Sequence, residues 1–124
     1  MGREISDFIK SDAVNKKINP EKQGRHIQSS KGYLPGRSYL YDGVDAQELV
    51  DKYHGTGRPE ISRIGIWKNV ENVSIESNIG VRVDPNTGEE THTNRFTIHY
   101  SNTGAHVVPA KPDKQRRLYE VVDV

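Results

Sequence analysis

Hydrophobic positions in the first part of the chain recur every three or four residues, which is the spacing of one side of a helix. The apolar residues with this spacing are Ile5, Phe8, Ile9 and Ala13. They predict an amphipathic helix over residues 3–17. A second, short helix is expected from Asn19 to about His26, because Asn19 and Pro20 are residue types that cap a helix and begin its first turn. A loop should follow at residues 29–36.

The clearest helix signal lies in the middle of the chain. Asp45 and Glu48 have the spacing of a capping box, in which an acid caps the helix and a glutamate follows three residues later. Apolar residues at helical spacing come next, and Gly55 is a typical stop after the last turn. This pattern predicts a helix over residues 46–54.

Beyond Gly57 the hydrophobic period changes from that of a helix to the alternation of strands. Strands are expected at residues 61–68, 79–84, 91–100, 105–109 and 118–124. Turn-forming sequences at residues 85–88 and 101–104 separate some of them. Helices followed by an antiparallel meander predict an α+β fold.

Length and composition indicate a single domain over residues 1–124. Only 32% of the residues are hydrophobic, and there is no cysteine, which excludes a disulfide scaffold, a thiolate nucleophile and a cysteine-based zinc site. No apolar run approaches the roughly 20 residues of a membrane span, and no secretory signal is recognisable. We divide the domain into an N-terminal helical part (1–19), a core (20–110) and a C-terminal strand or tail (111–124).

The formal net charge of +1 hides an uneven distribution along the chain. Residues 1–40 carry a net charge of +4, residues 41–93 a net charge of −5, and residues 94–124 a net charge of +2. If the two ends meet in the fold, they form a positive surface that suits a phosphate-bearing partner. Charge fluctuations of this size are also common within one domain, so the distribution alone does not identify a function.

The strand expected at residues 91–100 separates two kinds of side chain. Phe96, Ile98 and Tyr100 alternate with Arg95, Thr97 and His99. A two- or four-residue loop centred on residues 102–103 would place His99 opposite His106, with Cβ atoms about 4.5–5.5 Å apart. A three-residue loop would instead place Tyr100 beside His106. We favour the first register because it keeps Ala105 and Val107 on the apolar face.

Two neighbouring imidazoles on a partly basic face can perform acid–base chemistry on RNA. A neutral imidazole accepts the proton of a ribose 2′-hydroxyl, a protonated one donates to the leaving 5′-oxygen, and a cation stabilises the phosphate. No metal ion or cofactor is needed, and the histidine spacings do not resemble those of zinc sites. His26 is a third candidate beside Lys22 and Arg25. The alternative interpretation is structural, with solvent-facing histidines and cations that stabilise a helix end.

Three segments of the chain form a recognisable combination. They are residues 22–27 (KQGRHI), residues 48–50 with 55–57 (ELV and GTG), and above all residues 98–109 (IHYSNTGAHVVP). Together they resemble the polymorphic toxin type 50 domain (bacterial toxin 50), a predicted ribonuclease group of the barnase–EndoU–colicin E5/D–RelE-like superfamily found in bacterial toxins and phage minor head proteins. The resemblance implies N-terminal helices packed on one face of a four- to five-stranded antiparallel sheet, with the active site on the opposite face.

The resulting hypothesis is a metal-independent endoribonuclease toxin domain. The expected catalytic residues are His26, His99 and His106, and the expected substrate-binding residues are Lys22, Arg25, Arg95, Thr97, Tyr100 and Ser101. The resemblance implies RNA as substrate, tRNA or rRNA among the candidates, and a cognate immunity protein as partner. We expect the domain to be monomeric and to need no cofactor, metal ion or membrane.

The same resemblance implies action in the bacterial cytoplasm, after delivery as the C-terminal part of a larger secreted or phage-associated protein. Two other functions stay open at this point. One is a non-enzymatic phage-head module that binds nucleic acid or a capsid partner, and the other is an ADP-ribosyltransferase toxin.

Overall fold

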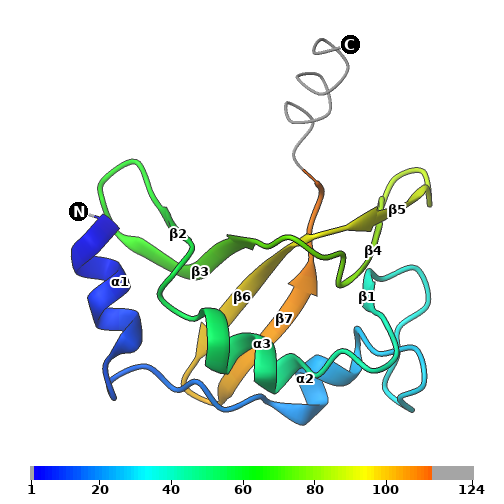
Figure 1. Cartoon of the computed structure of the whole chain (residues 1–124), viewed down its shortest axis with the longest axis horizontal. Helices are drawn as coiled ribbons and strands as arrows, with labels where there is room; N and C mark the ends of the chain where they lie inside the picture. Colours follow the sequence, from blue (N-terminus) through cyan, green and yellow to red (C-terminus); the bar gives the residue numbers. More distant parts are fainter. Residues whose placement is uncertain (1, 113–124) are drawn as a thin grey trace, which may run out of the picture.

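The computed structural model describes residues 2–112, and in this range helices come first and strands follow (Figure 1). The helices are α1 (Gly2–Lys10), α2 (Pro20–Gly24) and α3 (Ala46–Tyr53). The strands are β1 (Tyr39–Leu40), β2 (Arg58–Ile61), β3 (Trp67–Ser74), β4 (Gly80–Val83), β5 (Glu90–Thr93), β6 (Arg95–Ser101) and β7 (Gly104–Pro109). The fold class is α+β, as the sequence predicts. The strand expected at residues 118–124 lies outside the described residues.

The strands form two antiparallel sheets, of which the larger contains four strands in the order β2-β3-β6-β7. The smaller sheet has the order β1-β4-β5. In Figure 1, α3 lies in front of β6 and β7, while α1 and the smaller sheet lie at opposite ends of the molecule. None of the helices within residues 2–112 has the length and apolar character that crossing a membrane requires.

One expected strand, residues 91–100, is divided between the two sheets at Asn94. The backbone carbonyl of Asn94 accepts a hydrogen bond from Ile75 N, and its side chain donates to Ile75 O. The hydroxyl of Thr93 donates to Ala110 O at 2.7 Å. These bonds fix the chain where it passes from β5 to β6. The alternation of polar and apolar residues continues across this break, so the sequence pattern does not reveal it.

The first helix is shorter than the predicted range of residues 3–17, because α1 ends at Lys10. The hydroxyl and the amide of Ser11 both donate to Phe8 O, at 2.6 and 3.0 Å. A serine that bonds to nearby backbone competes with continuation of a helix. The following segment instead packs Val14 into the core in a non-helical conformation.

The strand predicted at residues 61–68 is wrong as a continuous element, since residues 62–66 form the turn between β2, which ends at Ile61, and β3, which begins at Trp67. Ser62 N donates to Ile66 O at 2.8 Å, and Gly65 supplies the positive φ of 86° that the turn requires. The β-branched residues that suggested a strand point into solvent, and the Ile64 side chain is 81% exposed. The actual strand, β3, follows the turn and is too polar to stand out in the pattern.

The free edge of β7 is covered by the chain that leads into α2. Asn19 N donates to Ala105 O and Ala105 N donates to Lys17 O, both at 2.8 Å. Further along the same edge, the side-chain amide of Gln23 donates to Val107 O at 2.9 Å and accepts from Val107 N at 2.7 Å. This pairing fixes α2 against β7 and so brings the residues after α2 to the edge of the larger sheet.

The core lies between one face of the larger sheet and the helices. Phe96, Ile98 and Tyr100 of β6 are buried and belong to one cluster with residues of α1 and α3, such as Ile9 and Val50. This confirms the predicted sorting of β6, in which the opposite face is left for Arg95, Thr97 and His99. The candidate chemistry therefore lies on the face that the helices do not cover.

Candidate active site

The β6–β7 hairpin places His99 directly opposite His106. The turn between the strands has two residues, because Ser101 pairs with Gly104 and only Asn102 and Thr103 lie between them. The two imidazole rings stack with centroids 4.8 Å apart and an interplanar angle of 15°. The predicted register is confirmed, and the two rings share one surface.

His26 follows α2, and its ring lies 6.1 Å from that of His106 at an interplanar angle of 11°. The side chain is only 6% exposed, and Nδ1 lies 2.8 Å from Ser38 O. Because a carbonyl oxygen only accepts, Nδ1 carries the hydrogen and Nε2 holds the lone pair of the neutral ring. Burial lowers the pKa of His26, as do the charges of Arg37 and Arg25, while the bond to Ser38 opposes the shift.

The three imidazoles form a continuous row in the order His99, His106 and His26, which we call the histidine row. His106, in the centre, has a pKa lowered to about 4, first by burial and then by the charges of His99, His26, Lys22 and Arg25. No group of the described chain forms a hydrogen bond with either ring nitrogen of His106. The central imidazole is therefore neutral at pH 7 and able to accept a proton.

His99 has an environment unlike that of the other two imidazoles, because a carboxylate acts on it. Burial lowers the pKa of His99, the charge of Glu60 raises it, and the charge of His26 lowers it. Thr97 Oγ1 lies 3.0 Å from His99 Nε2 and 3.4 Å from Val108 O. When the threonine hydroxyl donates to that carbonyl, it accepts from Nε2, and Nδ1 of His99 is left free.

A polar chain crosses the same sheet face from β2 to β6. The Asn72 side chain donates to Glu60 Oε2 at 3.4 Å and accepts from the Arg95 guanidinium at 3.3 Å. Register places Asn72 opposite Thr97, so this chain borders the histidine row. The sequence pattern did not predict Glu60 and Asn72 as site residues, because the β2–β3 turn was interpreted as a strand. Polar residues alternate on either side of residues 62–65, and this alternation is the signal that could have identified them.

Two of the predicted cationic residues, Lys22 and Arg25, act on the histidine row, and the third, Arg95, lies farther along the same sheet face. Lys22 Nζ donates to Ser101 Oγ at 3.3 Å and to Thr103 Oγ1 at 3.4 Å, which places it beside the hairpin turn. Arg25 is exposed after α2 and acts electrostatically on His106. Arg95 lies on the sheet face itself. The structure thus brings these three cations, together with Thr97 and Ser101 of β6, to one surface.

The structure does not bring Tyr100 to the histidine row, where it was expected with the other substrate-binding residues. Its side chain lies on the opposite face of β6, is 6% exposed and donates a 2.7 Å hydrogen bond to Glu71 Oε1. Burial and the contact with Glu71 raise the pKa of the phenol. The cause is the period of two, which assigns Tyr100 to the core with Phe96 and Ile98 and away from the histidines.

Comparison with known families gives a match to the family described as Bacterial toxin 50, over residues 18–109. The matched range starts in the segment that pairs with the edge of β7 and ends with β7 itself, so it contains the whole histidine row. Comparison with the curated proteins gives no match.

Proposed function

The chain belongs to the Bacterial toxin 50 family, and from this premise we propose that it is a metal-independent endoribonuclease. The observation that carries the proposal is the histidine row at the sheet face opposite the core, close to Lys22 and Arg25 and on the face that also carries Arg95. Acid–base groups next to several cations are the combination that cleavage of a phosphodiester requires.

In the proposed reaction His106 is the general base, because its low pKa keeps it neutral. It takes the proton of the ribose 2′-hydroxyl as the 2′-oxygen attacks phosphorus. The bond from phosphorus to the 5′-oxygen breaks, and His99 supplies the proton that the leaving oxygen needs. The products are a 2′,3′-cyclic phosphate and a 5′-hydroxyl end.

The division of roles between His99 and His106 follows from the groups around each ring. Glu60 favours the charged form of His99 and not that of His106, and the phosphate of a bound RNA adds a further negative charge. Thr97 holds the His99 ring through Nε2, so Nδ1 is the atom that can donate. His26 is largely buried and positions His106 by stacking.

The direct test compares His99→Ala and His106→Ala with His92→Ala, a matched control at an exposed position of β5. Removal of a general acid or base should lower the rate of RNA cleavage about 10²–10⁴-fold, whereas the control should cut RNA like the wild type. Circular dichroism establishes that all three variants are folded. Wild-type rates in both active-site variants would remove these histidines from the mechanism, and RNA that is bound without being cut would favour a non-enzymatic module.

Chelation provides a second test of the same chemistry. Because imidazoles carry out both proton transfers in the proposed reaction, cleavage by the wild type should continue unchanged in EDTA. Product ends are mapped in parallel, and a 2′,3′-cyclic phosphate identifies the internal attack of the 2′-oxygen. Loss of cleavage in EDTA that added metal restores would contradict the proposal.

We also propose that the target is RNA of the bacterial cytoplasm and that an immunity protein blocks the histidine row in the producing cell. An acidic surface on that protein would complement Lys22, Arg25 and Arg95. Co-expression with the product of the adjacent gene should yield a stable complex that no longer cuts RNA, and failure of the two proteins to copurify would contradict this part of the proposal.

A further inference from the structure

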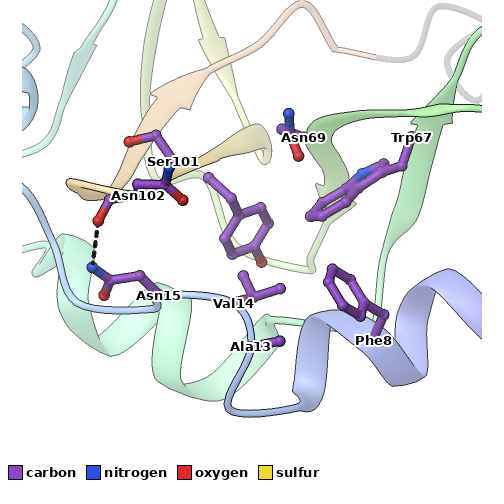
Figure 2. Close-up of a pocket in the computed structure, with 9 residues that line it drawn as sticks. Phe8, Ala13, Val14, Asn15, Trp67, Asn69, Ser101 and Asn102 are labelled. Atoms are coloured by element: carbon purple, nitrogen blue, oxygen red, sulfur yellow. Dashed lines mark hydrogen bonds between the residues drawn. The ribbon is translucent and has the colours of Figure 1, made fainter.

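A cavity of about 370 Å³ opens on the other side of the β6–β7 hairpin from the histidine row. Figure 2 shows Phe8 and Trp67 on one side of it, Ser101 and Asn102 on the other, and Asn69 at its rim. The lining combines aromatic rings with side-chain amides. Cavities of this size and mixed character are typical of small-ligand sites.

The aromatic side of the cavity is built from two rings that meet edge to face. The rings of Phe8 and Trp67 have centroids 6.2 Å apart and an interplanar angle of 82°. Phe8 is 49% exposed although it is a large apolar side chain. Trp67 donates its indole N–H to Val70 O at 3.0 Å, so its ring has a fixed orientation. Exposed, fixed aromatic rings are the surfaces on which nucleobases stack.

The amide at the rim is presented by a bulge in β3. Pro59 pairs with Glu71 and Ile61 pairs with Trp67, so β3 has two more residues than β2 between these pairs. Asn69, within the bulge, has a φ of 64°, which asparagine tolerates better than most residues. Within residues 2–112 no other group forms a hydrogen bond with the Asn69 side chain. The bulge therefore places an unused donor and acceptor beside the aromatic rings.

Ser101 connects this cavity to the histidine row. The residue lines the cavity, and its Oγ accepts a hydrogen bond from Lys22 Nζ at 3.3 Å. It lies two residues after His99 on β6, a separation of about 6.8 Å along a strand. A ribose–phosphate held by Lys22 thus lies against the same side chain that forms one wall of the cavity.

We propose that the cavity binds the base of a nucleotide next to the cleaved linkage. Trp67, whose ring has a fixed orientation, stacks on the base, Phe8 contacts the base through its perpendicular ring, and the amides of Asn69 and Asn102 bond to the edge of the base. The inference rests on the proposed ribonuclease activity and deepens it, because a side-chain amide that can both donate and accept distinguishes bases by their edge groups. The cavity would then set the sequence preference of the enzyme.

The experiment uses Trp67 as its own reporter, since it is the only tryptophan in the chain. Full-length protein is titrated with each of the four nucleoside 3′-monophosphates and with short RNAs in which 2′-deoxy substitution prevents cleavage. Fluorescence should change saturably, with one base preferred. Phe8→Ala should weaken binding roughly tenfold, because the base loses one of its two aromatic contacts.

Asn69→Gly is the sharper variant, because glycine adopts the positive φ without strain while the amide is removed. It should reduce the preference among the four bases, both in binding and in the mapped cleavage sites. Leu34→Ala and Asn86→Gly are the matched controls, one a half-exposed apolar residue and one an asparagine in a distant turn, and both should behave like the wild type.

The outcomes separate this inference from the ribonuclease proposal. If RNA is cut but no nucleotide changes the Trp67 fluorescence, and both cavity variants keep the wild-type base preference, the cavity is not a base site and the inference is overturned. The inference is overturned as well if the Trp67 fluorescence responds to the immunity protein but to no nucleotide. A response to nucleotides without any RNA cleavage would support the base site and contradict the ribonuclease.

Discussion

At the scale of single residues, the candidate site is dominated by the closeness of three imidazoles and the cations around them. Burial lowers the pKa of all three imidazoles, and the charge of a neighbouring histidine lowers the pKa of His99 and of His106 further. The pKa of the central residue, His106, is lowered first by burial and then by two histidines and two cations around it. The row therefore contains one imidazole with a low pKa, His106, and one whose protonated form a carboxylate favours, His99. An acid–base pair requires two groups that differ in this way.

The pH dependence of cleavage follows from this arrangement. A general base acts when deprotonated, so the rate with the wild type should rise with pH through about 4, the pKa of His106, and fall again where His99 loses its proton. The Lys22 charge lowers the pKa of His106, so Lys22→Gln should move the acidic limb of the profile to higher pH. The measurement is kcat/KM against pH, with exposed Lys31→Gln as control.

If the acidic limb of the Lys22→Gln profile stays at the wild-type pH, the charge of Lys22 does not lower the pKa of His106. The substitution also removes a proposed phosphate contact, and this effect lowers kcat/KM at every pH without shifting the limb. The position of the limb, rather than the height of the profile, is therefore the informative quantity.

At the scale of elements, the sequence predicts local structure where short-range signals decide it. Asn19 and Asp45 cap α2 and α3 as expected, since each side chain accepts from a backbone amide of the first turn. The register of the β6–β7 hairpin is also predicted, because only one register keeps Ala105 and Val107 with the core. The break at Asn94 and the bulge at Asn69 depend on partners far along the chain, which no local pattern contains.

The candidate site is predictable to the same extent and for the same reason. His99 and His106 face each other because of a register that local spacing sets. His26 joins them only because Gln23 fastens α2 to the edge of β7, which is a contact between residues 84 positions apart. The resemblance to a family predicted His26 as a catalytic residue, whereas its spacing in the sequence did not indicate that it lies beside His106 of β7. Glu60 was missed because its strand was misplaced.

The anchoring of α2 predicts a specific loss of stability. Gln23 is 2% exposed, and its side chain pairs with both backbone groups of Val107. Gln23→Ala leaves these buried groups without partners, which should lower the free energy of unfolding by about 2–4 kcal/mol. Urea denaturation measures the change, and Gln28→Ala, at an exposed position, is the control.

The same variant should also lower RNA cleavage, because His26 moves with α2. An unfolding free energy equal to that of the control would show that α2 is held by other contacts. Reduced stability with full activity at low temperature would show that His26 keeps its place without Gln23.

At the scale of the whole molecule, the fold gathers positive charge that is separated along the chain. Residues 17–25, from the basic N-terminal part, lie along β7, so Lys22 and Arg25 lie at the histidine row, on the same sheet face that carries Arg95 at the start of β6. The acidic residues of α3 and its cap lie on the opposite side of the larger sheet, where the helix packs on the core. The net charge of +1 therefore hides an uneven distribution, and the cations at the histidine row would favour the approach of an anionic ligand to this face.

This separation of charge predicts how RNA binding depends on salt. Three cations that each displace one counterion give a slope of about −2 when log K is plotted against log salt, since each contact to a single strand contributes about −0.7. Arg25→Gln should make the slope shallower by about 0.7. Substitution of an exposed arginine in the β2–β3 turn, Arg63→Gln, should keep the full slope.

Binding is measured with 2′-deoxy-substituted RNA, so that cleavage does not interfere. An equal change in both variants would mean that total charge attracts RNA, whereas a change confined to Arg25→Gln locates the phosphate contact at the histidine row.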